Sequence, residues 1–182
     1  MPRFCSACGA PIGVPAPVAC QSCGAGHWMK ASRAAAALVV HDGKLLLTQR
    51  AHEPWHTLWC APSGFCDGPE HPAEAAVRET LEEVGLRVRV VGYLGHWVDE
   101  YLPGADGGVE PQWCAVSYYH AVLVGGHELS FQQAEVSAAE WFLPDQLPQE
   151  LAPPGNGPRI YDAWREAFRA GRLESPLPDL GY

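Results

Sequence analysis

Residues 64–86 read GFCDGPEHPAEAAVRETLEEVGL, a glycine-containing turn followed by the clearest helical pattern in the chain. Pro72 suits the first turn of a helix, Glu74 places negative charge near its N-terminus, and Gly85 is a typical terminator. We therefore expect a helix over residues 72–84. Small and apolar residues recur at helical spacing, which predicts one buried face made of Ala73, Ala76, Val77, Thr80, Leu81 and Val84.

The same helix carries three carboxylates on one face, because Glu79, Glu82 and Glu83 are spaced i, i+3 and i+4. Like charges at such spacing destabilise a helix by roughly 0.2–0.5 kcal/mol per pair, and they stand at the end of the helix that disfavours negative charge. A hard divalent cation such as Mg²⁺ prefers carboxylate oxygens and would remove this conflict. The alternative is a solvated acidic face with Arg78 and Arg87 as partners.

The regions around this helix predict a mixed α/β domain. His41-Asp42-Gly43 joins two short apolar runs, and Asp-Gly is a strong hairpin signal. Residues 156–170 read as a final amphipathic helix that ends at Gly171, and residues 102–111 as a polar loop. Strands are predicted at residues 34–40, 44–48, 87–93, 113–124 and 140–143.

The acidic helix and the turn before it resemble the Nudix box, G-x5-E-x7-R-E-U-x-E-E-x-G-U, where U is a bulky apolar residue. The only soft departure is Thr80 at a U position. Residues 45–50 (LLLTQR) and 59–65 (WCAPSGF) also look like the family's approach to the box, with Ser63 in place of a usual glycine. The resemblance covers roughly residues 34–170 and implies the family's α/β/α sandwich with a mixed sheet. The matched box positions are Gly64, Glu70, Arg78, Glu79, Glu82, Glu83, Gly85 and Leu86.

This resemblance implies a hydrolase of nucleoside diphosphates linked to another group, dependent on Mg²⁺ or Mn²⁺. Carried over by position, Glu82 and Glu83 would be the main metal ligands, and Glu79 a further ligand or the base. Arg78 would orient these acids, and the backbone carbonyl of Ser63 would help to bind the metal. The box's upstream acid, Glu70, would be tied to the loop and to the outer shell of the metal.

The general base lies outside the box in several family members, on a loop after the central strands. Glu135, five residues before Glu140, stands where such an acid is usually found, so we predict it to be a ligand or base. Glu128 is the alternative. Arg50 and Trp97 are the predicted substrate-binding residues, although core packing is the other interpretation of Trp97.

Residues 1–33 hold two C-x-x-C-G knuckles, formed by Cys5, Cys8, Cys20 and Cys23. This spacing is typical of a zinc ribbon, and four thiolates leave no open position for water, which predicts a structural Zn²⁺. His27 could replace one cysteine. We expect a zinc ribbon over residues 1–33 and the Nudix domain over residues 34–182.

The composition limits the partners of the chain. Its 182 residues carry 12 basic and 21 acidic side chains, a net charge of −9, which disfavours nucleic acid as the main partner. No apolar run approaches the roughly 20 residues of a membrane span, and the N-terminus has no signal core. Seven cysteines, four of them in knuckles, indicate a reducing compartment, the cytoplasm.

A zinc ribbon before a Nudix domain resembles two subgroups: NADH pyrophosphatases, and enzymes acting on ADP-ribose or FAD. The first carries S-Q-P-W-P-F-P after the box, a motif absent from residues 92–98 (GYLGHWV). Pro103 lies one residue from a proline position of the second, so we favour a small-molecule substrate like ADP-ribose or another dinucleotide. The alternatives are an NADH or NAD-cap pyrophosphatase, and a non-catalytic nucleotide- or protein-binding module. Family members often pair, so a homodimer is possible.

Overall fold

The computed structural model describes residues 4–12, 18–28, 30–102, 112–126, 128–131 and 133–175. The predicted loop at residues 102–111, apart from its first residue, lies outside this part of the chain, and so does Pro103. Within the described ranges, no helix is both long enough and apolar enough to span a bilayer.

The main sheet has seven strands in the order β5-β4-β3-β8-β7, with β6 paired to β3 and β9 to β4. Strand β3 runs parallel to β8, whereas the other pairs are antiparallel, so the sheet is mixed as predicted. The strands are β3 (Ser32–His41), β4 (Lys44–Arg50), β5 (Trp59–Cys60), β6 (Ser63–Phe65), β7 (Arg87–Leu102), β8 (Gln112–Gly125) and β9 (Val136–Phe142).

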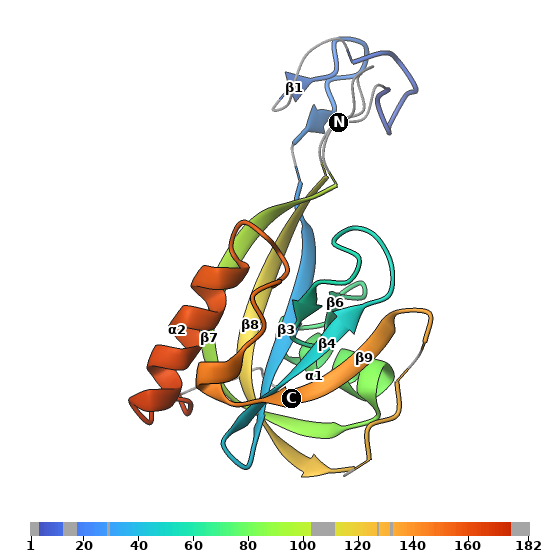
Figure 1. The fold of residues 1–182 in the computed structure, drawn as a ribbon. Helices are drawn as coiled ribbons and strands as arrows, with labels where there is room; N and C mark the ends of the chain where they lie inside the picture. The colour runs from blue at the N-terminus through green and yellow to red at the C-terminus, as the bar shows by residue number, and fades with distance from the viewer. Residues whose placement is uncertain are drawn as a thin grey trace.

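Helices cover both faces of this sheet (Figure 1). Alternate residues of β3 supply the two cores: Ala35, Ala37 and Val39 pack with helix α1 (Pro72–Val84), and Ala36 and Leu38 pack with helix α2 (Gly157–Arg169). A strand buried on both faces reads as a continuous apolar run, as β3 does. A short 3-10 helix, η1 (Pro144–Gln146), precedes α2. The α/β/α sandwich predicted from the sequence is confirmed.

Local sequence determines several of these elements. Helix α1 has the predicted bounds and ends where Gly85 adopts φ 72°, a left-handed conformation that glycine accepts without strain. The β3–β4 turn places Asp42 at φ 49° and Gly43 at φ 74°, which confirms the hairpin. Strand β7 is longer than predicted because it pairs with β8 as far as Leu102.

The predicted buried face of α1 is partly wrong. Leu81 is 48% exposed, whereas Ala75 is fully buried and Glu83 is only 9% exposed. The helix packs against β6 and β7 as well as β3, so its buried face includes the side that carries Glu83. Thr80 is buried as expected, and its hydroxyl donates to the carbonyl of Ala76.

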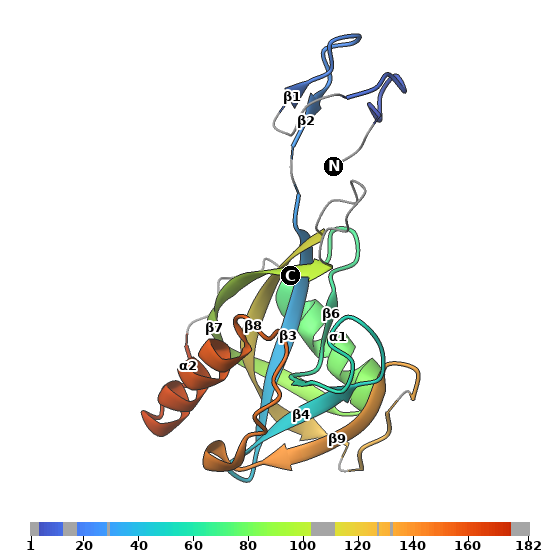
Figure 2. The same cartoon turned by 45° about the horizontal axis from the view of Figure 1, so that its top comes forward.

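Among the described residues before β3, the strands are the short antiparallel pair β1 (Val18–Ala19) and β2 (Gly26–His27). Figures 1 and 2 place this N-terminal segment beyond the end of β3, away from both helices. Its described residues therefore do not contribute to the packing of the sandwich.

A buried hydrogen bond attaches α2 to the segment after β5: the Tyr161 hydroxyl accepts from the backbone N–H of Ala61 at 2.7 Å. Tyr161→Phe would leave this buried N–H without an acceptor, so we expect the free energy of unfolding to fall by about 1–3 kcal/mol. Urea unfolding measures it. Tyr93→Phe, at an exposed tyrosine, is the matched control, and equal effects of the two changes would contradict the prediction.

Candidate active site

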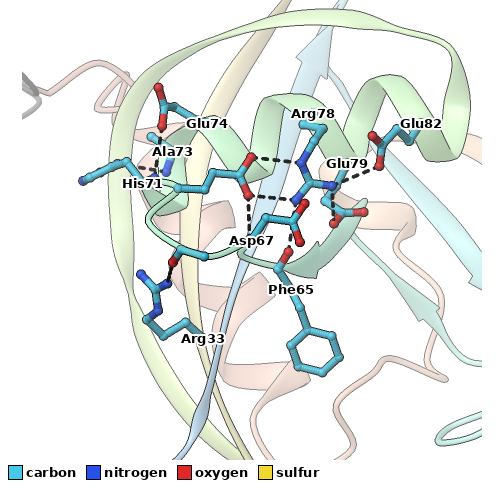
Figure 3. Close-up of polar contacts among 11 residues, drawn as sticks. Arg33, Phe65, Asp67, His71, Ala73, Glu74, Arg78, Glu79 and Glu82 are labelled. Atoms are coloured by element: carbon cyan, nitrogen blue, oxygen red, sulfur yellow. Dashed lines mark hydrogen bonds and ion pairs between the residues drawn. The ribbon is translucent and has the colours of Figure 1, made fainter. Parts of the chain in front are cut away.

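Arg78 joins the turn before α1 to the acids of the helix (Figure 3). Its Nε and Nη2 donate to the two carboxylate oxygens of Glu70, both at 2.9 Å, and Nη2 also donates to the carbonyl of Phe65 at 3.0 Å. Its Nη1 donates to Glu79 at 2.7 Å and to Glu82 at 3.0 Å. The hydrogen bonds from Arg78 lower the pKa of Glu70 to about 2, so this carboxylate is ionised at neutral pH.

The turn itself is held by local hydrogen bonds. Glu70 accepts from the backbone N–H of Asp67 at 2.9 Å. His71 caps α1 through Nδ1, which accepts from Ala73 N at 3.1 Å, and Glu74 accepts in return from His71 N at 3.0 Å. Arg78 is therefore held by the ordered turn before α1 and by the acids of the helix itself.

Glu79 lies directly against the backbone of Gly64. A Cβ atom built on Gly64 would stand 2.1 Å from the carboxyl carbon of Glu79, which is far inside van der Waals contact. Only glycine leaves room for the carboxylate in this position. The burial of Glu79 raises its pKa, against the opposing effect of Arg78.

Glu83 is the most buried acid of the helix, and the backbone N–H of Ser63 donates to its Oε2 at 3.3 Å. Burial, and then the negative charge of Glu79, raise the pKa of Glu83 to about 8. Two buried carboxylates side by side favour a bound cation, because a cation restores the ionised form of both.

One cleft brings together five of the predicted site residues: Arg50, Ser63, Glu79, Glu83 and Glu135. Glu135 comes from the residue before β9, and its backbone carbonyl accepts from Ala51 N at 2.9 Å, which fixes this segment beside the end of β4. Its charge also raises the pKa values of Glu79 and Glu83.

The lining of this cleft does not include four other candidate residues: Arg78, Glu82, Trp97 and Glu128. The side chain of Glu82 is 51% exposed and contacts Arg78. Trp97 packs edge-to-face on Tyr118 at 5.5 Å, within the core beneath α2. Glu128 is exposed and is not part of the lining. The substrate-binding role of Trp97 stays a prediction.

The cleft also contains residues that the sequence did not single out, among them Tyr101 and Cys60. Tyr101 reaches it because β7 continues well beyond the predicted strand. Arg50 is held at the cleft by its Nε, which donates to the carbonyl of Pro54 at 2.7 Å, and by the ring of Trp55 at 5.7 Å. No sequence signal marked Tyr101.

The chemistry of these acids fits a hard divalent cation, although their oxygens do not converge as they stand. Among the described residues, the four knuckle cysteines alone form a compact set of three or more metal-ligating atoms. Arg78 instead holds oxygens of Glu79 and Glu82. A cation bound by these acids would therefore need these side chains to turn toward it.

The cysteine cluster fits Zn²⁺ directly. The four sulfurs lie within 4.8 Å of one another, with Cys5 and Cys23 separated by 3.6 Å and Cys8 and Cys20 by 3.7 Å. Tetrahedral Zn–S bonds of about 2.3 Å place sulfurs about 3.8 Å apart, close to these values. His27 Nε2 lies 3.3 Å from the Cys5 sulfur, beside the cluster rather than in place of a cysteine.

Comparison with known families matches the NUDIX domain over residues 31–163. The chain belongs to the Nudix family. Among solved structures, a NUDIX hydrolase from Nitrosomonas europaea superimposes with a TM-score of 0.70 at 22% identity, covering 92% of this chain and 90% of that one. An ADP-ribose pyrophosphatase from Streptococcus suis gives a TM-score of 0.55 at 26% identity, covering 77% and 93%.

Two kinds of Nudix relative resemble the sequence. The NAD-capped RNA hydrolase NudC of Pseudomonas fluorescens is 27% identical over 179 residues, covering 97% of this chain and 60% of its own length. The CTP pyrophosphohydrolase of Escherichia coli is 30% identical over 149 residues, covering 81% and 98%. The chain thus spans only about three-fifths of the NudC relative.

Replacing Gly64 tests the contact with Glu79. In Gly64→Ala the new methyl group would displace the Glu79 carboxylate, the mobile end of a side chain. We therefore expect the hydrolytic activity proposed below to fall at least about tenfold with little loss of stability. Steady-state kinetics and urea unfolding measure the two effects. Gly26→Ala, in the N-terminal segment away from the cleft, would meet nothing closer than 3.4 Å and is the control. Unchanged activity of Gly64→Ala would contradict the assigned contact.

The raised pKa of Glu83 predicts a pH dependence in magnesium-free buffer. The folded protein keeps the Glu83 proton up to about pH 8, whereas the unfolded chain loses it near 4.5. Because the unfolded state binds fewer protons over this range, Glu83 makes the free energy of unfolding fall as pH rises. Urea unfolding across the range should show a flatter dependence for Glu83→Gln, and added Mg²⁺ should stabilise the wild type alone. Parallel pH profiles for the two proteins would contradict the assignment.

Proposed function

We propose that this protein hydrolyses the pyrophosphate bond of a nucleoside diphosphate linked to a second group and releases a nucleoside monophosphate. The observation that carries the proposal is the cleft in which Glu79, Glu83 and Glu135 meet the guanidinium of Arg50. This reaction requires acids that hold a metal ion and a positively charged side chain that contacts phosphate.

A pyrophosphate is kinetically inert because its anionic oxygens repel an attacking oxygen. Bound Mg²⁺ or Mn²⁺ would screen that charge and acidify a coordinated water. Glu79, Glu82 and Glu83 would hold the metal, with the Ser63 carbonyl as a further contact. Glu135 would complete the ligand set or accept the proton of the attacking water.

Arg50 and Arg78 would have different tasks. Arg50 faces the cleft and is fixed by Pro54, so it would bind phosphate oxygens of the substrate. Arg78 would orient Glu79 and Glu82 without contacting the substrate, since its donors are engaged by the protein.

As the substrate we favour ADP-ribose or a similar dinucleotide. The likeness to an ADP-ribose pyrophosphatase supports this choice. NAD-capped RNA, the substrate in the name of the NudC relatives, and CTP, in that of the Escherichia coli relative, are the alternatives. The net charge of −9 disfavours RNA.

The remaining assignments complete the proposal. Residues 1–33 would form a ribbon stabilised by Zn²⁺ bound to Cys5, Cys8, Cys20 and Cys23, and residues 34–182 the hydrolase domain. The thiolates of this centre need a reducing compartment, for which we propose the cytoplasm. The protein would act as a monomer or homodimer on a small nucleotide.

Glu83→Gln tests the catalytic role. Removing this carboxylate should lower kcat/KM at least about a thousandfold, by loss of a metal ligand or base, while the fold is kept. Release of nucleoside monophosphate in the presence of Mg²⁺ is measured over ADP-ribose, NADH, FAD, nucleoside triphosphates and NAD-capped RNA. Glu166→Gln, at an exposed position of α2, is the matched control.

Two results would contradict the proposal. Activity of Glu83→Gln within tenfold of the wild type would show that this acid does not serve the reaction. No turnover of any compound by the wild type, with Mg²⁺ bound, would favour a non-catalytic binding module.

A further inference from the structure

A second, apolar cleft adjoins the cleft that is lined by Glu79, Glu83 and Glu135, here called the carboxylate cleft. The apolar cleft has a volume of about 70 Å³, and its walls include Ala34, Val116 and Ala152. The two clefts share one wall, formed by Arg50, Cys60, Ser63, Gly64, Phe65 and Tyr101. A molecule whose phosphates lie at Arg50 can therefore extend its next group into the apolar cleft.

Asp99 is the carboxyl side chain that lines the apolar cleft without lining the carboxylate cleft. It stands on β7 opposite Cys114 of β8 and is only 7% exposed. Its Oδ1 accepts from the side-chain amide of Asn156 at 2.9 Å. Its Oδ2 is buried and has no hydrogen-bond partner within the described part of the chain.

A buried carboxylate oxygen without a donor destabilises the fold, so its retention needs a reason. The catalytic assignments make no use of Asp99, and the walls near it are apolar. Burial raises the pKa of Asp99, against the opposing effect of Asn156. A ligand that brings an N–H group into the cleft would supply the missing partner.

The mouth of the cleft suits an aromatic ring. Tyr101 packs edge-to-face against Trp55 and against Phe65, each with ring centroids 5.5 Å apart, and all three line the cleft. Aromatic side chains in this arrangement leave ring faces on which a flat heterocycle can stack. The cleft thus combines aromatic walls, a phosphate-facing arginine and one buried acceptor.

We propose that this cleft binds the nucleobase of the substrate and that Asp99 selects a base with an exocyclic amino group at C4 of a pyrimidine or C6 of a purine. Cytosine and adenine would donate this amine to Oδ2. Uracil and hypoxanthine carry a carbonyl oxygen there, which would face the carboxyl oxygen. Because a site built to accept a hydrogen bond rejects analogues that lack the donor, Asp99 is a specificity residue. This inference rests on the proposed function.

The test uses substrate pairs that differ only at this position: CTP against UTP, and ADP-ribose against its inosine analogue. For the wild type we expect kcat/KM to favour the amino compound at least tenfold in each pair. In Asp99→Asn the side-chain amide can offer a donor as well as an acceptor, so the preference should fall at least tenfold, mainly through KM. Asp42→Asn, at the exposed β3–β4 turn, removes the same charge and should leave the preference unchanged.

Preferences below threefold in the wild type, or an unchanged preference in Asp99→Asn, would overturn the inference. If Asp99→Asn does not fold, equilibrium binding of CMP against UMP to the wild type decides, and equal affinities overturn it. If no compound is hydrolysed, the proposed function fails instead, and the same binding measurement still tests the role of Asp99.

Discussion

The site depends on one guanidinium. Without Arg78, three acids of α1 and Glu70 of the preceding turn would stand close together with no ion pair among the described contacts of Glu70, Glu79 and Glu82. Its ion pairs with Glu70, Glu79 and Glu82 compensate this repulsion and fasten the turn to the helix. The pairs with Glu70 and Glu79 are partly buried and are therefore stronger than exposed ion pairs, which contribute little, whereas the Glu82 side chain is 51% exposed.

This arrangement explains why the box needs its spacing. Arg78 must follow Glu70 by about two helical turns to reach back to it, and Gly64 must lack a side chain so that Glu79 can lie against the strand. Glu83, one turn after Glu79, then enters the space beside Ser63. These fixed residues of the box therefore each make a contact that depends on this path of the backbone.

The sequence predicted the parts of the fold that local chemistry controls. The bounds of α1, the Asp42-Gly43 turn and the proximity of the four knuckle cysteines follow from residue type and spacing. The full extent of the buried face of α1 and the length of β7 could not be predicted in this way, because both depend on which elements pack against them. Leu81 is the more apolar residue, yet tertiary contacts bury Ala75 in preference.

The two clefts show where sequence patterns lose their information. Glu82 and Glu83 follow Glu79 by about one helical turn, so the clustering of these three acids can be predicted from the sequence. Asp99 and Arg50 come from different strands, and Asp99 reads as an ordinary polar residue of an alternating strand. Only the pairing of β7 with β8, and the contact of Asn156 before α2, bury its carboxylate.

The two candidate metal centres also differ in how far the sequence alone predicts them. The cysteines supply converging sulfurs within a small segment, so the cluster is recognisable in both sequence and structure. The carboxylates do not converge in this way, and Arg78 binds two of the acids that a cation would use. Arg78 therefore serves as the countercharge of these acids while no divalent cation is bound. Because it also holds Glu70 and the carbonyl of Phe65, it can give up the helix acids and keep the turn in place.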